Sequence, residues 1–245
     1  ITAATMTVPG TVHANAYGHA KDAGTGKGTG FNNLNNRAGG GASHGGNGSD
    51  SSTGGAGGTA SYGSLLEPVS YGSGGGTSYY YCTTNGGAGG GAIKIVVTGT
   101  LTVSGTISAN GGDGAACYFN FSQASGGGAG GSIWVNAGSV AGTGTVAANG
   151  GAGGVQGGYK GGGGGGGRVA VHYTGTLNGG LALRAFGGYG NTYAGAGTVV
   201  TKQGSNNPRL IIDNNSNGGA VTPIDLTGVT VQALLVTNAG HVIEL

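Results

Sequence analysis

Residues 92–110 read AIKIVVTGTLTVSGTISAN, and this stretch decides how the rest of the chain is interpreted. Apolar side chains occupy alternate positions from Ile93 to Ile107, and Gly99 and Gly105 mark breaks in the pattern. A period of two is typical of a strand with one buried face. Glycine permits the tight corners between such strands. The stretch therefore predicts three short strands that form one coil of a β-solenoid.

The same pattern returns along the chain. It appears as SIWVNAGSVAGTGTVAAN at residues 132–149 and, in a degraded form, as RVAVHYTGTLNGGLALRAF at 168–186. A further start, TVVTK, lies at 198–202, and LIID at 210–213 resembles a late strand of a coil. GTVHAN at 10–15 matches the last strand of the first two copies. Repeats at a spacing of a few tens of residues indicate stacked coils.

Glycine-rich inserts separate the copies. The largest spans residues 16–91, and another, at 150–167, ends in seven consecutive glycines. One interpretation is disorder, because fixing the backbone of a residue costs about 1–2 kcal/mol. The other is order as polyglycine II-type helices lying side by side, where each N–H can bond a neighbour and the missing Cβ permits close approach. The runs stop at the same point before each coil, which favours order.

The repeats and inserts together predict an all-β fold. We expect a right-handed parallel β-solenoid whose glycine-rich insertions pack as polyglycine II-type helices. Residues 1–245 are expected to form a single solenoid repeat unit, with the insertion at 16–91 as its largest elaboration.

The composition argues against several classes of function. Asp, Glu, Lys and Arg make up 7% of the 245 residues, whereas ordinary soluble domains have about 25%. The formal net charge of +2 is spread over the chain without a basic cluster, so nucleic acid is not an expected partner. No apolar run reaches the roughly 18 residues of a membrane helix, so no membrane span is expected.

The residues that usually carry catalysis are sparse. The seven acidic residues share no short motif that would provide a pair of carboxylates, and the five histidines lack the spacing of metal ligands. We therefore predict no enzymatic activity, no metal site and no cofactor.

Two cysteines and a group of aromatic residues lie in the inserts on either side of the first complete coil. A disulfide between Cys82 and Cys117 is expected if the protein is exported, and two buried free thiols are the alternative. Aromatic side chains stack on sugars and anchor protein interfaces, so a contact surface is expected here. Internal packing around the disulfide is the alternative. The aromatic residues are Tyr79, Tyr80, Tyr81, Tyr118, Phe119 and Phe121.

Two further sets of residues are singled out by position. Asn15, Asn110 and Asn149 end three coils at the same place, which predicts a ladder of stacked amide side chains, and asparagine tolerates a left-handed turn there. The chain also begins and ends in what looks like mid-coil, so its ends are expected to continue one another in a tandem array or between stacked subunits. The residues expected at these assembly ends are Ile1, Met6, Val242 and Leu245.

The phrases GGAGGGAIKIVVTGTLTVSGTISANGGDG, GGGAGGSIWVNAGSVAGTGTVAANGGAG and GGGGGGGRVAVHYTG resemble the glycine-rich repeats of very large exported proteins of bacterial cell surfaces. YGSLLEPVSYGSGGG, at residues 62–76, resembles another segment of those proteins, so the resemblance covers most of residues 1–215. It implies a β-helical scaffold and a surface location, and it implies no activity. The glycine runs are also similar to those of phage tail-fibre tip adhesins, which lack the coil phrase.

We therefore expect a structural subunit of an extracellular filament or surface fibre that polymerises head to tail through its solenoid ends. An adhesin that binds surface glycans through the 16–91 insertion and the aromatic residues is the alternative. Ice binding through threonine-bearing faces is a third hypothesis, although the threonines do not recur from coil to coil.

Overall fold

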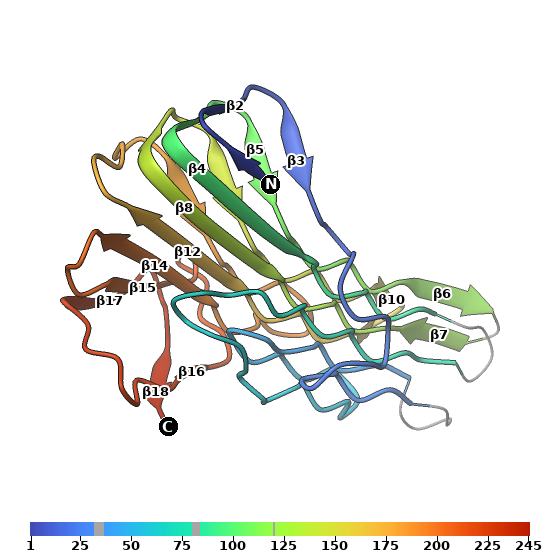
Figure 1. The fold of residues 1–245 in the computed structure, drawn as a ribbon. Helices are drawn as coiled ribbons and strands as arrows, with labels where there is room; N and C mark the ends of the chain where they lie inside the picture. Colours follow the sequence, from blue (N-terminus) through green and yellow to red (C-terminus); the bar gives the residue numbers. More distant parts are fainter. Residues whose placement is uncertain (32–36, 80–83, 120) are drawn as a thin grey trace.

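The structure, a computed structural model, describes residues 1–31, 37–79, 84–119 and 121–245. Within these ranges the fold is all-β, without helices, and its sheets are mostly parallel. The strands of the two larger sheets gather in one half of the molecule, while the glycine-rich segments fill the other half as long, nearly straight runs (Figure 1).

The largest sheet has the strand order β1-β4-β8-β12-β14-β15-β17, and β2 also pairs with β4. Its pairings are parallel except between β14 and β15. The strands of this sheet are β1 (Thr2–Ala3), β2 (Met6–Val8), β4 (Ala92–Val103), β8 (Ser132–Ala141), β12 (Arg168–Tyr173), β14 (Thr198–Gln203), β15 (Arg209–Asp213) and β17 (Ala233–Thr237).

A second, four-stranded parallel sheet faces the first. Its order is β13-β9-β5-β3, and its strands are β3 (Thr11–His13), β5 (Thr106–Ser108), β9 (Thr145–Ala147) and β13 (Ala182–Arg184). Three two-stranded sheets complete the described part of the fold. They are β6 (Ala116–Phe119) with β7 (Phe121–Ala124), β10 (Val155–Gln156) with β11 (Tyr159–Lys160), and β16 (Thr222–Ile224) with β18 (Val242–Glu244).

The repeats found in the sequence lie beside one another in register, as predicted. The four coil entries occupy one row of the large sheet, Ile93 opposite Ile133, then Val169, then Val199. The alternation in β4 also has the expected meaning, because its buried side chains face a core shared with the four-stranded sheet. Residues of β5 and β9, such as Ile107, close that core from the other side.

Two details of the predicted coil are wrong. Gly99 does not separate two strands, because β4 runs through it as one strand with an irregularity between Val97 and Thr100. The LIID segment is not a late strand of a parallel coil. It forms part of β15, which pairs with β14 in the antiparallel direction and so reverses the strand direction at this end of the sheet.

The glycine-rich runs are hydrogen-bonded to one another, and most of their residues are buried, whereas residues 110–115 are partly or fully exposed. We call them the glycine layer. It consists of residues 38–48, 55–58, 72–76, 85–91, 109–115, 125–131, 148–154, 161–167, 185–188 and 194–197.

Residues 125–131 show how this layer is built. Their backbone N–H groups donate in a repeat of three, to 109–115, to 72–76 and to 161–167, at N···O distances of 2.7–3.0 Å. Their carbonyl groups accept hydrogen bonds from three further segments, including 85–91. The run is thus surrounded by six neighbours, so its polar backbone is satisfied without water.

The seven glycines at 161–167 are all buried, and every one of their N–H groups donates a hydrogen bond of 2.7–2.9 Å. A Cβ at any of them would lie less than 3.0 Å from a carbonyl oxygen of another segment. None of the seven has a positive φ, so a left-handed backbone is not the reason for glycine here. These positions require glycine because neighbouring backbones approach too closely to leave room for a side chain.

Candidate functional site

Tyr118, one of the aromatic residues singled out from the sequence, belongs to β6, which lies with β7 and β10 at the end of the glycine layer farthest from the large sheet (Figure 1). We call this end of the layer the loop end. Tyr79 and Tyr118 are 47% and 68% exposed. Tyr79 donates its N–H to the carbonyl of Phe31, and this places two parts of the 16–91 insertion side by side. The guanidinium carbon of Arg37 lies 4.9 Å from the ring centre of Tyr159, in the same region. Tyr79 and Tyr118 therefore present their aromatic rings to solvent.

Tyr80, Tyr81 and Cys82 lie outside the described residues. The backbones of Phe119 and Phe121 pair across the β6–β7 hairpin.

The predicted disulfide between Cys82 and Cys117 also involves a residue outside the described ones. Cys117 belongs to β6, and because Cys82 lies outside the described residues, the disulfide stays a prediction.

Asn15, Asn110 and Asn149 lie in a row where coils meet the glycine layer. The side-chain Oδ1 of Asn15 accepts the N–H of Asn110, at 2.8 Å, and Oδ1 of Asn110 accepts the N–H of Asn149, also at 2.8 Å. Oδ1 of Asn149 then accepts the N–H of Phe186. Each hydrogen bond therefore joins an asparagine side chain to the backbone N–H at the matching position of the next coil. A left-handed turn does not explain these residues, because none of the three has a positive φ.

The predicted assembly ends are placed differently from one another. Ile1, 60% exposed, precedes β1 at one edge of the large sheet, and Met6 packs against the core from β2. Val242 belongs to β18, which pairs with β16 in a separate small sheet, and Leu245 follows it, 72% exposed. The far edge of the large sheet is formed instead by β17.

At strand β17, apolar side chains on both faces of the large sheet are exposed to solvent. Leu234 and Leu235 are 42% and 45% exposed, and Val236 is 40% exposed. Leu234 lies opposite Leu210, which is buried on the outer face of the sheet, and Leu235 lies opposite Ile211, which packs against the inner core. Both faces of the sheet thus end in exposed apolar side chains, a pattern typical of a surface that meets a partner.

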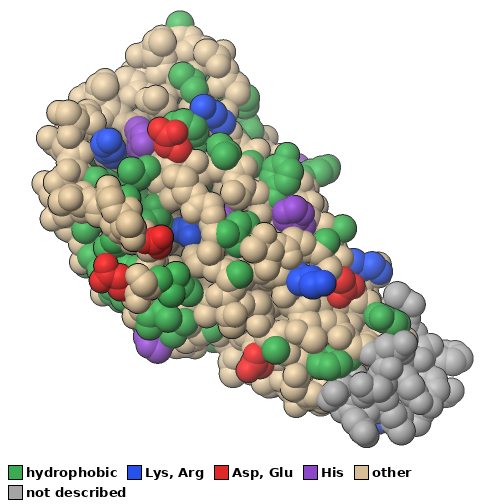
Figure 2. Space-filling view, turned by 60° about the horizontal axis from the view of Figure 1, so that its bottom comes forward, with side chains coloured by type: hydrophobic (Ala, Val, Ile, Leu, Met, Phe, Trp, Pro, Cys, Tyr) green, Lys and Arg blue, Asp and Glu red, His purple; other side chains and the backbone are tan. Residues whose placement is uncertain are grey.

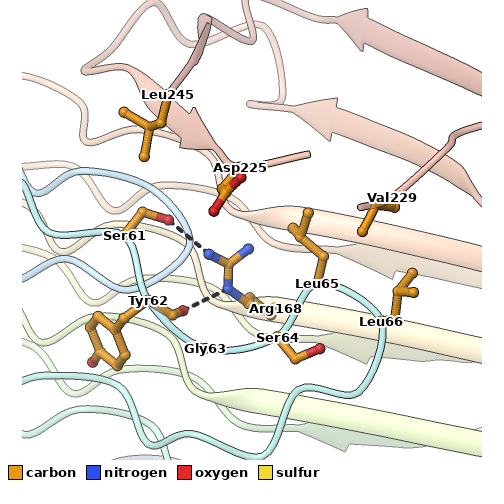
Figure 3. A pocket seen from close by; sticks show the side chains of 10 residues that line it. All are labelled: Ser61, Tyr62, Gly63, Ser64, Leu65, Leu66, Arg168, Asp225, Val229 and Leu245. Carbon is orange, nitrogen blue, oxygen red and sulfur yellow. Dashed lines mark hydrogen bonds between the residues drawn. The ribbon is translucent and has the colours of Figure 1, made fainter. Parts of the chain in front are cut away.

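A buried polar cluster, which the sequence reasoning missed, lies between the glycine layer and the large sheet. Arg168, at the start of β12, is 3% exposed, and its Nε donates to the carbonyl of Tyr62 at 2.9 Å (Figure 3). Nη2 donates to Oγ of Ser61 at 2.7 Å and Nη1 to Oγ1 of Thr198 at 3.1 Å. Removal from water lowers the pKa of Arg168 to about 10, so the guanidinium stays charged at neutral pH.

His44 and Tyr62 complete this cluster, and their ring centres are 4.6 Å apart. His44 is fully buried, and its Nδ1 lies 2.8 Å from the carbonyl oxygen of Gly130, which can only accept. Burial, together with the charge of Arg168, lowers the pKa of His44 to about 3. His44 is therefore neutral, with its proton on Nδ1. Burial also raises the pKa of the Tyr62 hydroxyl, which lies 2.7 Å from Oγ of Ser73.

The sequence did contain a signal for Arg168. The matching row of the large sheet holds Ala92, Ser132, Arg168 and Thr198, so one large charged residue stands where the other coils have small ones. The signal was weak because the segment that covers Arg168, residues 61–66, comes from an insert far away in sequence.

Among the described residues there is no cluster of three or more histidine, cysteine or acidic residues that could hold a metal ion. In the same part of the chain, no helix has the length and apolar character needed to cross a membrane. On the face shown in Figure 2, charged side chains are scattered without a large patch of one sign.

Comparisons with known proteins give no relative. No family model, no curated protein and no solved structure matches the chain.

Proposed function

We propose that this protein is a structural subunit of an extracellular filament or surface fibre and that it assembles end to end through the open edges of its large sheet. The observation that carries the proposal is strand β17, where the inner and the outer apolar layers both end uncovered. At the opposite edge, β1 and β2 present the other free side of the same sheet. A sheet with two open edges favours association that does not close on itself.

The scaffold we propose is a right-handed parallel β-solenoid with polyglycine II-type helices beside it. The in-register rows of β4, β8, β12 and β14, with a second parallel sheet across the core, support stacked coils. The repeat of three in the hydrogen bonds of residues 125–131, shared with six neighbours, supports the threefold helices. A backbone that is hydrogen-bonded to neighbours on all sides suits a protein with a structural role.

The resemblance of the coil phrases to those of exported bacterial surface proteins supports the extracellular location. A Cys82–Cys117 disulfide belongs to this proposal, since such bonds persist in oxidising compartments. Alkylation of the denatured, unreduced protein followed by intact-mass measurement tests it. The expected result is no added alkyl group, and modification of both cysteines would contradict it.

Replacement of Leu235 by Lys tests the assembly. The side chain is 45% exposed, so the subunit itself should tolerate lysine, whereas a covered interface should not. In sedimentation velocity and electron microscopy, we expect the unmodified protein to form end-to-end particles as its concentration rises and the Leu235→Lys variant to remain monomeric.

The matched control is Val155→Lys, which makes the same change in charge at a 52% exposed residue of β10, away from both sheet edges. It should assemble like the unmodified protein. A monomer at every concentration, or equal assembly of all three proteins, would overturn the proposal.

An adhesin is the second candidate, and the exposed tyrosines on the loop end of the glycine layer favour it. In this hypothesis, Tyr79 and Tyr118 stack on surface glycans. A glycan array should then show binding that falls at least about tenfold in the Tyr79→Ala/Tyr118→Ala protein, because each stacked ring contributes about 1 kcal/mol or more. Tyr17→Ala, at a 71% exposed residue elsewhere, is the control. Absence of any bound glycan would contradict this candidate.

A further inference from the structure

A cavity of about 410 Å³ lies above the buried Arg168. The segment 61–66 forms one wall, and residues near the C-terminal end of the chain form another (Figure 3). One part of the lining is polar, with Ser61, Ser64 and the guanidinium of Arg168. The other part is apolar. Its side chains are Leu65, Leu66, Val229 and Leu245.

Two N–H groups of the Arg168 guanidinium have no hydrogen-bond acceptor among the described residues. Arginine carries five N–H groups, and the three hydrogen bonds to Tyr62, Ser61 and Thr198 use one on each nitrogen. One N–H on Nη1 and one on Nη2 therefore remain for a ligand. A pair of N–H groups on neighbouring nitrogens matches the two oxygens of a carboxylate.

The positive charge also lacks a carboxylate partner in the part of the chain that the structure describes. No carboxylate among the described residues lies within 4.0 Å of it as an ion pair, and the group that raises its pKa is the hydroxyl of Tyr62, which is uncharged at neutral pH. Asp225, on the opposite side of the cavity, instead accepts the N–H of Thr227 at 2.8 Å (Figure 3). A buried charge without a counter-ion is costly, so a bound anion would stabilise this arrangement.

We infer that the cavity binds a small monocarboxylate with a short apolar body, with its carboxylate on the two free N–H groups of Arg168 and its apolar part against Leu65 and Leu66. The exposed carboxylate of Asp225 disfavours a second negative charge in the cavity, which selects a monoanion. The apolar wall favours a hydrocarbon body over a bare inorganic ion. This site is separate from β17 and from the tyrosines at the loop end.

Titration calorimetry with butyrate, at constant ionic strength balanced with chloride, tests the inference. We expect saturable binding of one butyrate per chain and none of 1-butanol, which has the same apolar body without the charge. Arg168→Met should lose at least about tenfold in affinity, because a charge-assisted bidentate pair is removed.

Asp225→Asn provides the sharper test, because this exposed side chain can change without disturbing the core. Removal of its negative charge should tighten butyrate binding about two- to fivefold. Asp113→Asn is the matched control in the glycine layer, and it should leave the affinity unchanged. The inference is overturned if the unmodified protein shows no saturable binding of butyrate, if 1-butanol binds equally well, or if Asp225→Asn does not tighten binding.

Discussion

At the scale of single residues, the fold depends on positions where a side chain would not fit. Gly164 is buried in the middle of the glycine layer, and its N–H donates to the carbonyl of Gly151. A Cβ there would overlap the carbonyl oxygen of Gly128, which is itself held by a hydrogen bond from Gly151. The neighbouring backbone is paired on several sides, so it cannot move aside for one methyl group without losing other hydrogen bonds.

Gly164→Ala should therefore lower the free energy of unfolding by about 1–3 kcal/mol, the usual range for forced overpacking. Gly179→Ala is the control, because nothing lies within 4 Å of the Cβ position there. Its effect should be small and can be stabilising, since alanine restricts the unfolded chain. Denaturant unfolding of both variants measures the difference. Equal stability of the two would contradict close packing at Gly164.

His44 makes stability depend on pH. Its pKa is about 3 in the folded protein and 6.5 as the ordinary value, so between these values the unfolded chain binds a proton that the folded protein does not. The free energy of unfolding should thus fall by about 1 kcal/mol per pH unit as the pH drops below 6.5, and level off near pH 3. His44→Gln, which keeps a donor for Gly130, should remove this slope. An equal slope in both proteins would show that His44 is not buried neutral.

At the scale of elements, the sequence predicted what depends on local periodicity and repetition. The burial of alternate side chains in β4 and the common register of Ile93, Ile133 and Val169 follow from the pattern of apolar residues. The continuity of β4 through Gly99 did not, because parallel neighbours hold the strand together where local sequence suggests a break. The reversal at β15 was also missed, since strand direction depends on a connection whose sequence does not reveal it.

The candidate sites divide in the same way. The exposed tyrosines at the loop end could be anticipated because aromatic residues stand out in glycine-rich inserts. The cluster of His44, Tyr62 and Arg168 was missed, because Arg168 is more than 100 positions away from the other two residues and meets them through a layer with no side-chain pattern. The open edge was expected at Val242 and Leu245 and lies at β17, because the strand order is set by tertiary pairing.

At the scale of the whole molecule, the strand directions restrict how copies can join. Strand β17 runs antiparallel to β1, because only the β14–β15 pairing in the large sheet reverses direction. A head-to-tail contact between β17 of one copy and β1 of the next would therefore be an antiparallel pairing. Contact between two β17 strands would instead give a closed dimer and no filament.

Cysteine cross-linking distinguishes these two assemblies. We expect a mixture of Thr2→Cys and Leu235→Cys proteins to form a mixed disulfide-linked dimer under mild oxidation, because the two positions meet only in a head-to-tail contact. Each variant alone should stay unlinked on non-reducing gels. Linked dimers of the Leu235→Cys protein alone would indicate the closed dimer.

The central claim is that the glycine runs are ordered because their backbone amides bond to one another. Hydrogen exchange of residues 161–167, followed by mass spectrometry or NMR in the intact protein, tests this most directly. All seven amides donate to other segments, so they should exchange at least about a thousandfold more slowly than an unstructured glycine chain, as core amides of a stable fold do. Exchange at the rate of an unstructured chain would contradict the account.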